Sequence, residues 1–167
     1  FQGNSTMPWL TVEENVGFGL LYKPLSDAEK KERTEKYLEI VGLTKYRKYY
    51  PKQLSASMLQ RVSIARAFAT EPELLLMDEP YGQLDIELRF RLEDELVKLW
   101  QMTKTTVLFI THNIEEAVYL GNKIMILTNK PTTVKTTLIN ELPRPRDIAD
   151  PQFIELRNKV TELIKWW

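Results

Sequence analysis

The sequence predicts an α/β fold in which buried strands alternate with amphipathic helices along the middle of the chain. Two short apolar segments, residues 74–77 and 106–110, are bounded by turn-forming or polar residues and have the composition of strands buried on both faces of a parallel sheet. Leucines at helical spacing, from Leu88 to Leu99, lie between these segments. The 167 residues, 43% of them hydrophobic, suffice for one packed core with a small satellite.

The first part of the chain is expected to be mainly helical. Residues 1–25 contain several Pro and Gly residues, which predicts loop and short helix. A Ser-x-x-Glu capping box at Ser26 predicts a helix that continues to about Val41. After a proline break, a further helix is expected over residues 57–70.

The last part of the chain predicts a helix that ends near Leu120, strands over residues 123–128 and 134–141, and a terminal amphipathic helix. The second of these strands alternates in the way that a solvent-facing strand does. The apolar face of the terminal helix consists of Phe153, Leu156, Val160, Leu163 and Trp167.

Composition excludes several classes of protein. The 23 Lys and Arg residues balance 23 Asp and Glu residues, which argues against a protein that binds nucleic acid or anionic lipid through bulk charge. With no cysteine and one histidine, the sequence offers neither a disulfide framework nor a zinc site. Its longest apolar runs are far shorter than the roughly 20 residues that span a bilayer. The start at Phe1, without a signal-peptide pattern, predicts a part of a longer protein.

Two adjacent carboxylates, Asp78 and Glu79, directly follow the first predicted strand. Open parallel sheets bind ligands at the carboxyl ends of their strands, so Asp78 can orient Mg²⁺ while Glu79 aligns or deprotonates a water molecule. The alternative is that both carboxylates only cap the next turn. The sole histidine, His112, follows the second strand at the same edge, where it can contact a substrate or be merely structural or solvated.

Five segments follow one another in a specific order: Leu54 to Met58, Gln60 to Ala67, the strand that ends in Asp78-Glu79-Pro80, Leu84-Asp85, and Thr111-His112. This order resembles the motifs of the ATP-binding-cassette (ABC) transporter ATPases. The resemblance implies a partial P-loop NTPase-like fold with a mainly parallel sheet core and a helical subdomain. Residues 8–16 and 142–147 are similar to the nitrate, sulfonate and taurine importer branch of the family.

The resemblance implies ATP and Mg²⁺ as cofactors and assigns a role to each motif. Glu79 is the catalytic carboxylate and His112 the switch histidine, while Gln2, the Q-loop glutamine, approaches Mg²⁺ and the attacking water. Asp78 and Gln2 hold the metal. The signature motif and the D-loop contact the nucleotide through Ser55, Ala56, Ser57, Met58 and Asp85.

The resemblance also implies partners and a domain organisation. A second ATPase subunit, identical or different, is expected to bind head to tail, with transmembrane permease subunits, a solute-binding protein as an indirect partner and no nucleic acid. The subunit then lies on the cytoplasmic face of the cell membrane through the permease. Residues 1–70 form the Q-loop, helical subdomain and signature helix, residues 71–141 the α/β core, and residues 142–167 a tail with an amphipathic helix.

Two departures from the family pattern are visible. Ala56 and Ser57 replace the two adjacent glycines that let the backbone close on a phosphate, although Ser57 is expected to donate from its backbone and cap the helix. None of the six glycines belongs to a Gly-x-x-x-x-Gly-Lys-Ser/Thr phosphate loop. The chain is therefore expected to be the C-terminal part of an importer ATPase for a small anion such as nitrate, sulfonate or taurine, and to be inactive alone.

Other interpretations of the sequence are also open. The missing loop reflects either removal of an N-terminal part or a natural truncation. The chain can also be a non-catalytic, truncated or degenerate subunit that docks on a permease or a partner ATPase. DNA-repair and chromosome ATPases share the motifs, but the interval between Gln2 and Ser55 has no room for their long coiled coil.

Overall fold

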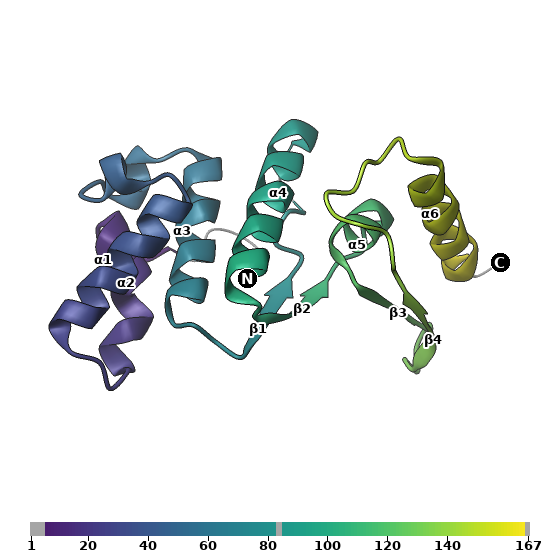
Figure 1. The fold of residues 1–167 in the computed structure, drawn as a ribbon, viewed down its shortest axis with the longest axis horizontal. Helices are drawn as coiled ribbons and strands as arrows, with labels where there is room; N and C mark the ends of the chain where they lie inside the picture. Colours follow the sequence, from purple (N-terminus) through teal and green to yellow (C-terminus); the bar gives the residue numbers. More distant parts are fainter. Residues whose placement is uncertain (1–5, 83–84, 166–167) are drawn as a thin grey trace. The chain divides into compact units, whose positions relative to one another are not determined.

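A computed structural model describes residues 6–82 and 85–165, and it confirms the α/β class. The chain forms two compact units, residues 1–108 and 109–167 (Figure 1). The first unit contains α1 (Val12–Gly17), η1 (Phe18–Tyr22), α2 (Asp27–Ile40), η2 (Thr44–Tyr46), η3 (Pro51–Gln53), α3 (Ala56–Ala69), β1 (Leu74–Asp78) and α4 (Ile86–Thr103). Strand β2 (Thr106–Ile110) crosses the boundary, and the second unit continues with α5 (Ile114–Leu120), β3 (Lys123–Leu127), β4 (Val134–Ile139) and α6 (Pro151–Ile164).

Helices α1, α2 and α3 pack against one another in the first unit. The capping box predicted at the start of α2 is confirmed, because the Ser26 hydroxyl accepts a hydrogen bond from the Glu29 N–H at 3.3 Å and the Glu29 carboxylate accepts one from the Ser26 N–H at 2.7 Å. A second capping box, formed by Thr11 and Glu14, starts α1. The apolar side of α2, including Tyr37, is buried in this cluster. Helices α1, α2 and α3 thus share buried apolar side chains, while a separate helical subdomain over residues 1–70 stays a prediction.

Strands β1 and β2 are neighbours in a two-stranded sheet. The Thr106 N–H donates to the Glu73 carbonyl oxygen at 3.1 Å, and because this bond joins the beginnings of both strands, they run in the same direction. The prediction that β1 is buried on both faces is wrong, since Leu74 and Leu76 are 53% and 67% exposed. Leu108 on β2 is likewise exposed, because no element of the described chain covers this face of the two strands.

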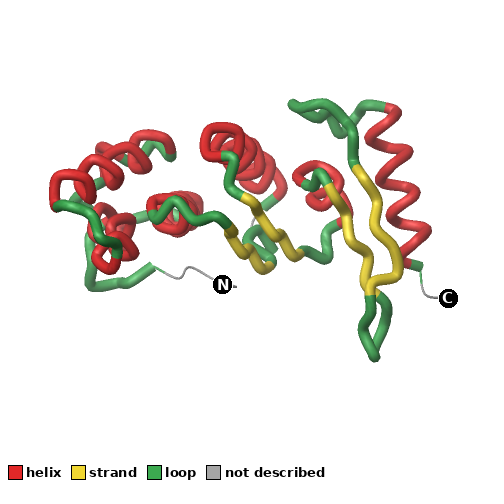
Figure 2. Tube along the Cα trace, turned by 60° about the horizontal axis from the view of Figure 1, so that its bottom comes forward, coloured by secondary structure: helices red, strands yellow, loops and turns green. Residues whose placement is uncertain are grey.

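Strands β3 and β4 form an antiparallel pair in the second unit, with Lys123 opposite Ile139. The apolar alternation of β3 places Ile124 and Ile126 in a core with α6, whose Phe153 is buried there. Helix α6 runs beside the two strands (Figure 2). Strand β4 is largely exposed, as its alternation predicts. The predicted apolar face packs there through Phe153, Leu156, Val160 and Leu163, while Trp167 lies outside the described residues.

Candidate functional site

Strand β1 ends in a tight turn that carries the two carboxylates. Asp78 is the last residue of the strand and is exposed, while Glu79 has a left-handed backbone with φ 42°. This conformation costs a residue other than glycine about 1–2 kcal/mol. The Gly82 N–H donates to the Glu79 carbonyl oxygen at 3.3 Å and closes the turn around Pro80. Backbone strain of this kind concentrates at functional sites, where neighbouring structure maintains it.

Two helices hold this turn in place. The side-chain amide of Gln60, on α3, donates a hydrogen bond to the Pro80 carbonyl oxygen at 3.0 Å. Tyr81 is 1% exposed, and its hydroxyl donates to the Leu92 carbonyl oxygen of α4 at 3.3 Å. These contacts anchor the two residues that directly follow Glu79.

The amino end of α3 carries the expected signature residues. Ser55 has extended backbone (φ −71°, ψ 164°), and its hydroxyl accepts a hydrogen bond from the Met58 N–H at 3.3 Å. The prediction that Ser57 caps the helix is wrong, because the helix begins at Ala56 and leaves Ser57 inside the first turn. The N–H groups of Ala56 and Ser57 have no acceptor within the helix, and the helix dipole adds partial positive charge there. This helix end suits an anion.

Asp85 lies at the start of α4. Asp85 caps α4, since its carboxylate accepts a hydrogen bond from the Leu88 N–H at 2.9 Å. A contact of Asp85 with nucleotide stays a prediction beside this capping role. Gln2 and residues 83–84 of the expected D-loop lie outside the described residues.

His112 belongs to the second unit and is exposed between two residues that are fastened to α5. The Thr111 hydroxyl donates to the buried Glu116 carboxylate at 2.6 Å, and the Asn113 N–H donates to the Thr111 hydroxyl at 2.9 Å. The Asn113 side chain caps α5 by accepting from the N–H groups of Glu115 and Glu116. The residues on either side of His112 are therefore both bonded to α5. That His112 acts together with the carboxylates after β1 stays a prediction.

The residues present fit a metal that is shared with a phosphate. Among the described residues, no three or more His, Cys, Asp and Glu side chains gather closely enough to hold a metal ion. Asp78 nevertheless presents an exposed carboxylate, and Mg²⁺ is usually held by one or two carboxylates together with substrate phosphates and water. Asp78 suits this arrangement and not a closed protein cage.

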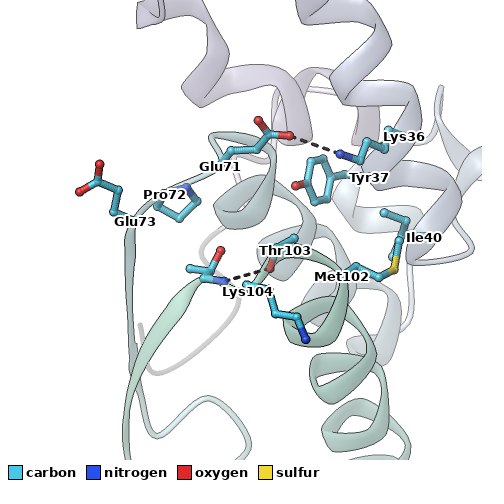
Figure 3. Close-up of a pocket in the computed structure, with 10 residues that line it drawn as sticks. Lys36, Tyr37, Ile40, Glu71, Pro72, Glu73, Met102, Thr103 and Lys104 are labelled. Atoms are coloured by element: carbon cyan, nitrogen blue, oxygen red, sulfur yellow. Dashed lines mark hydrogen bonds and ion pairs between the residues drawn. The ribbon is translucent and has the colours of Figure 1, made fainter.

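A cavity of about 640 Å³ lies at the opposite end of β1 from the carboxylates (Figure 3). Glu73, which precedes β1, and Thr105, which precedes β2, both line it. Lys36 on α2 also lines it and forms an ion pair with Glu71 at 3.3 Å. The cavity is therefore separate from the candidate site.

Sequence reasoning did not find two sets of residues that shape the site. Gln60 lies in a motif of the resemblance, but nothing in the sequence indicates that it bonds to the turn after β1. In the sequence, Arg144 and Arg146 indicate only a resemblance to one importer branch. In the structure, their guanidinium groups contact the last carbonyls of α5. Strands β3 and β4 lie between α5 and these arginines in the sequence, so no local pattern indicated the contact.

Solved structures with this arrangement of strands and helices are ATP-binding cassettes, which have the P-loop NTPase fold. A sequence model described as "ABC transporter" matches residues 1–82. The ATP-binding cassette MJ0796, solved as a dimer bound to ADP and Pi, superposes with a TM-score of 0.68 at 31% identity, over 86% of this chain and 62% of that one. Residues 1–82 thus match the ABC transporter family, and the chain has the fold of an ABC ATPase domain.

Curated relatives agree with this family. An uncharacterized ABC transporter ATP-binding protein of Methanocaldococcus jannaschii is 44% identical over 99% of this chain and 62% of its own length. The aliphatic sulfonates import ATP-binding protein SsuB of Bacillus cereus is 42% identical over 99% of this chain and 65% of its own length. The chain thus spans less than two thirds of these relatives.

Proposed function

We propose that the chain is the hydrolytic part of an ATPase subunit that drives an ABC importer. The observation that carries the proposal is the strained turn at Glu79, held by Gln60 of the helix that begins with the signature residues. This connection links the carboxylate to the helix end that suits an anion. The match of residues 1–82 to the ABC transporter family supports the same function.

Glu79 accepts a proton from the attacking water and aligns that water with the γ-phosphate. A general base of this kind contributes about 10²- to 10⁴-fold to a rate. His112 holds the water and the phosphate from the other strand end. Asp78, with Gln2, holds Mg²⁺, which neutralises phosphate charge when it is bound.

The signature end of α3 serves a nucleotide bound by a second subunit. Ser55 positions the first turn, and the backbone N–H groups of Ala56 and Ser57 donate to the phosphate. Met58 and Asp85 also contact this nucleotide. The solved cassette MJ0796, described as dimeric, supports a pair of subunits, for which we propose a head-to-tail arrangement.

The helical region from Trp9 to Tyr50 docks on a transmembrane permease. Aromatic side chains are exposed there, and exposed apolar patches mark interaction sites; they are Trp9, Tyr22, Tyr46, Tyr49 and Tyr50. No helix in the described part of the chain has the length and apolar character needed to cross a membrane. Docking on the permease holds the subunit at the cytoplasmic face of the membrane.

The solute is a small anion of the sulfonate, taurine or nitrate kind, delivered to the permease by a solute-binding protein. The relatives named as aliphatic sulfonates importers support this choice. The ATPase subunit itself recognises the permease and the nucleotide, and not the solute.

The 167-residue chain alone is inactive, because its sequence lacks the glycine-rich loop that holds the β- and γ-phosphates. Calorimetric titration with ATP is expected to detect no micromolar binding to this chain. Micromolar affinity would contradict this part of the proposal.

The function is tested in a complete subunit that carries these residues within a protein of the relatives' length. We expect His112→Ala to abolish ATP hydrolysis while ATP binding persists, and Lys123→Ala, an exposed change in the same unit, to leave both unchanged. A complete wild-type subunit that binds permease without hydrolysing ATP would instead indicate the non-catalytic alternative raised by Ala56 and Ser57.

A further inference from the structure

Two arginines enclose the carboxyl end of helix α5. The Nη1 atom of Arg146 lies 2.9, 2.8 and 2.9 Å from the carbonyl oxygens of Val118, Tyr119 and Gly121. Arg144 donates to the Tyr119 carbonyl oxygen at 3.1 Å and also to that of Leu120. The last carbonyls of a helix have no acceptor role within it, so these contacts satisfy groups that the short helix leaves open.

The side chains around the carboxyl end of α5 include a buried charge. Arg146 is 7% exposed and Asn140, which donates to the Val118 and Gly121 carbonyl oxygens at 2.8 and 2.9 Å, is 3% exposed. Burial, together with the charge of Arg144, lowers the pKa of Arg146 to about 10, so its guanidinium remains charged at neutral pH. A cation at this end of a helix interacts favourably with the helix dipole.

The opposite end of α5 is fastened to the residues on either side of His112. Asn113 caps the helix, and Thr111 donates to Glu116 within its first turn. Helix α5 contains only 7 residues, so its two ends are separated by less than two full turns. A displacement of its carboxyl end therefore reaches Asn113 and Thr111 directly.

We propose that Arg144 and Arg146 are positioning residues that hold the His112 loop in place through helix α5. The contacts carry this inference, and its importance for catalysis rests on the proposed function of His112. In this role, neither arginine contacts the nucleotide. They fix the backbone from which the histidine side chain extends.

The single histidine of the chain makes a direct test possible, because its ring protons can be followed by NMR without assigning a second histidine. The 167-residue chain is compared with its Arg146→Gln and Arg144→Gln variants. We expect both variants to shift the ring resonances of His112. Backbone amides of residues 117–121 are expected to exchange about tenfold faster, the change that accompanies loss of hydrogen bonds from a charged donor. Arg146→Lys, which retains the cation, should move both readouts less than Arg146→Gln.

Two control variants separate positioning from general loss of stability. Arg157→Gln removes an arginine of α6 whose guanidinium bonds to the adjacent Asn158. Val160→Ala removes buried volume from the core of the second unit. Neither control should shift the His112 resonances. Unchanged His112 resonances in both arginine variants would overturn the inference, and so would an equal shift in Val160→Ala. Because NMR reports no turnover, failure of the proposed ATPase function is recognised separately, by the His112→Ala assay.

Discussion

The side-chain amide of Gln60 donates a 3.0 Å hydrogen bond to the backbone carbonyl oxygen of Pro80. This bond connects the helix that begins at the signature residues with the turn that carries the candidate catalytic carboxylate. A movement of α3 is therefore transmitted to the turn without an intermediate side chain. The same turn is anchored to α4 by the buried Tyr81.

Removal of this bond should loosen the turn. We expect Gln60→Ala to lower the free energy of unfolding by about 1 kcal/mol, because the half-buried Pro80 carbonyl loses its donor. Urea denaturation measures the change. Gln101→Ala, on an exposed position of α4, is the matched control and should leave stability unchanged. Equal stabilities of the Gln60→Ala and control variants would contradict the assigned contact.

The left-handed backbone of Glu79 predicts an unusual order of stabilities. Glycine adopts positive φ without steric cost, so Glu79→Gly should be about 1 kcal/mol more stable than Glu79→Ala. In an ordinary helix or strand position, alanine is the more stable of the two. Thermal unfolding of both variants checks the order, with Glu95→Gly and Glu95→Ala on α4 as the comparison pair. An alanine variant as stable as the glycine variant would mean that the turn relaxes.

The altered signature predicts a gain of activity on reversion. We expect Ala56→Gly combined with Ser57→Gly to raise ATP turnover in a complete subunit, because the backbone can approach the phosphate more closely. The change should also cost the helix up to about 1 kcal/mol per residue. Ala67→Gly near the other end of α3 controls for that cost. No increase in turnover would show that the present backbone already fits.

Acid should weaken the helical cluster of the first unit. Hydrogen bonds from Thr11 and Ser26 hold the pKa values of Glu14 and Glu29 below their usual 4.5. The ionised carboxylates therefore stabilise the folded state above pH 4.5, and this contribution is lost as the pH falls through the lowered pKa values. We expect Glu29→Gln to flatten the decline of the melting temperature between neutral pH and about pH 3. Glu32→Gln on the same helix, outside the capping box, should retain the wild-type slope.

Local signals were sufficient for most elements. The capping box at Ser26 and the apolar spacing of α6 predicted helices that are present, because each depends on neighbours within a few turns. The strand at residues 106–110 has the predicted bounds. The prediction that β1 is buried on both faces was wrong, because a continuous apolar run does not indicate whether another element covers each face. Burial depends on elements that are distant in sequence.

The site was harder to predict from the sequence than the fold. The resemblance indicated Glu79, but the positive φ of this residue follows from the contacts made by Pro80 and Tyr81. The cap of α3 was assigned to Ser57 instead of Ser55, an error of two residues within a run of three small ones. Element boundaries are fixed by backbone conformation, which short polar residues permit at several neighbouring positions.

We assign the proton transfer in ATP hydrolysis to Glu79. The most direct measurement compares ATP turnover of a complete wild-type subunit with that of its Glu79→Gln variant, with ATP affinity measured on both. We expect Glu79→Gln to lose about 10²- to 10⁴-fold in turnover with unchanged ATP affinity. The control Glu73→Gln, at the other end of β1, should retain full turnover. Wild-type turnover in Glu79→Gln would contradict the account.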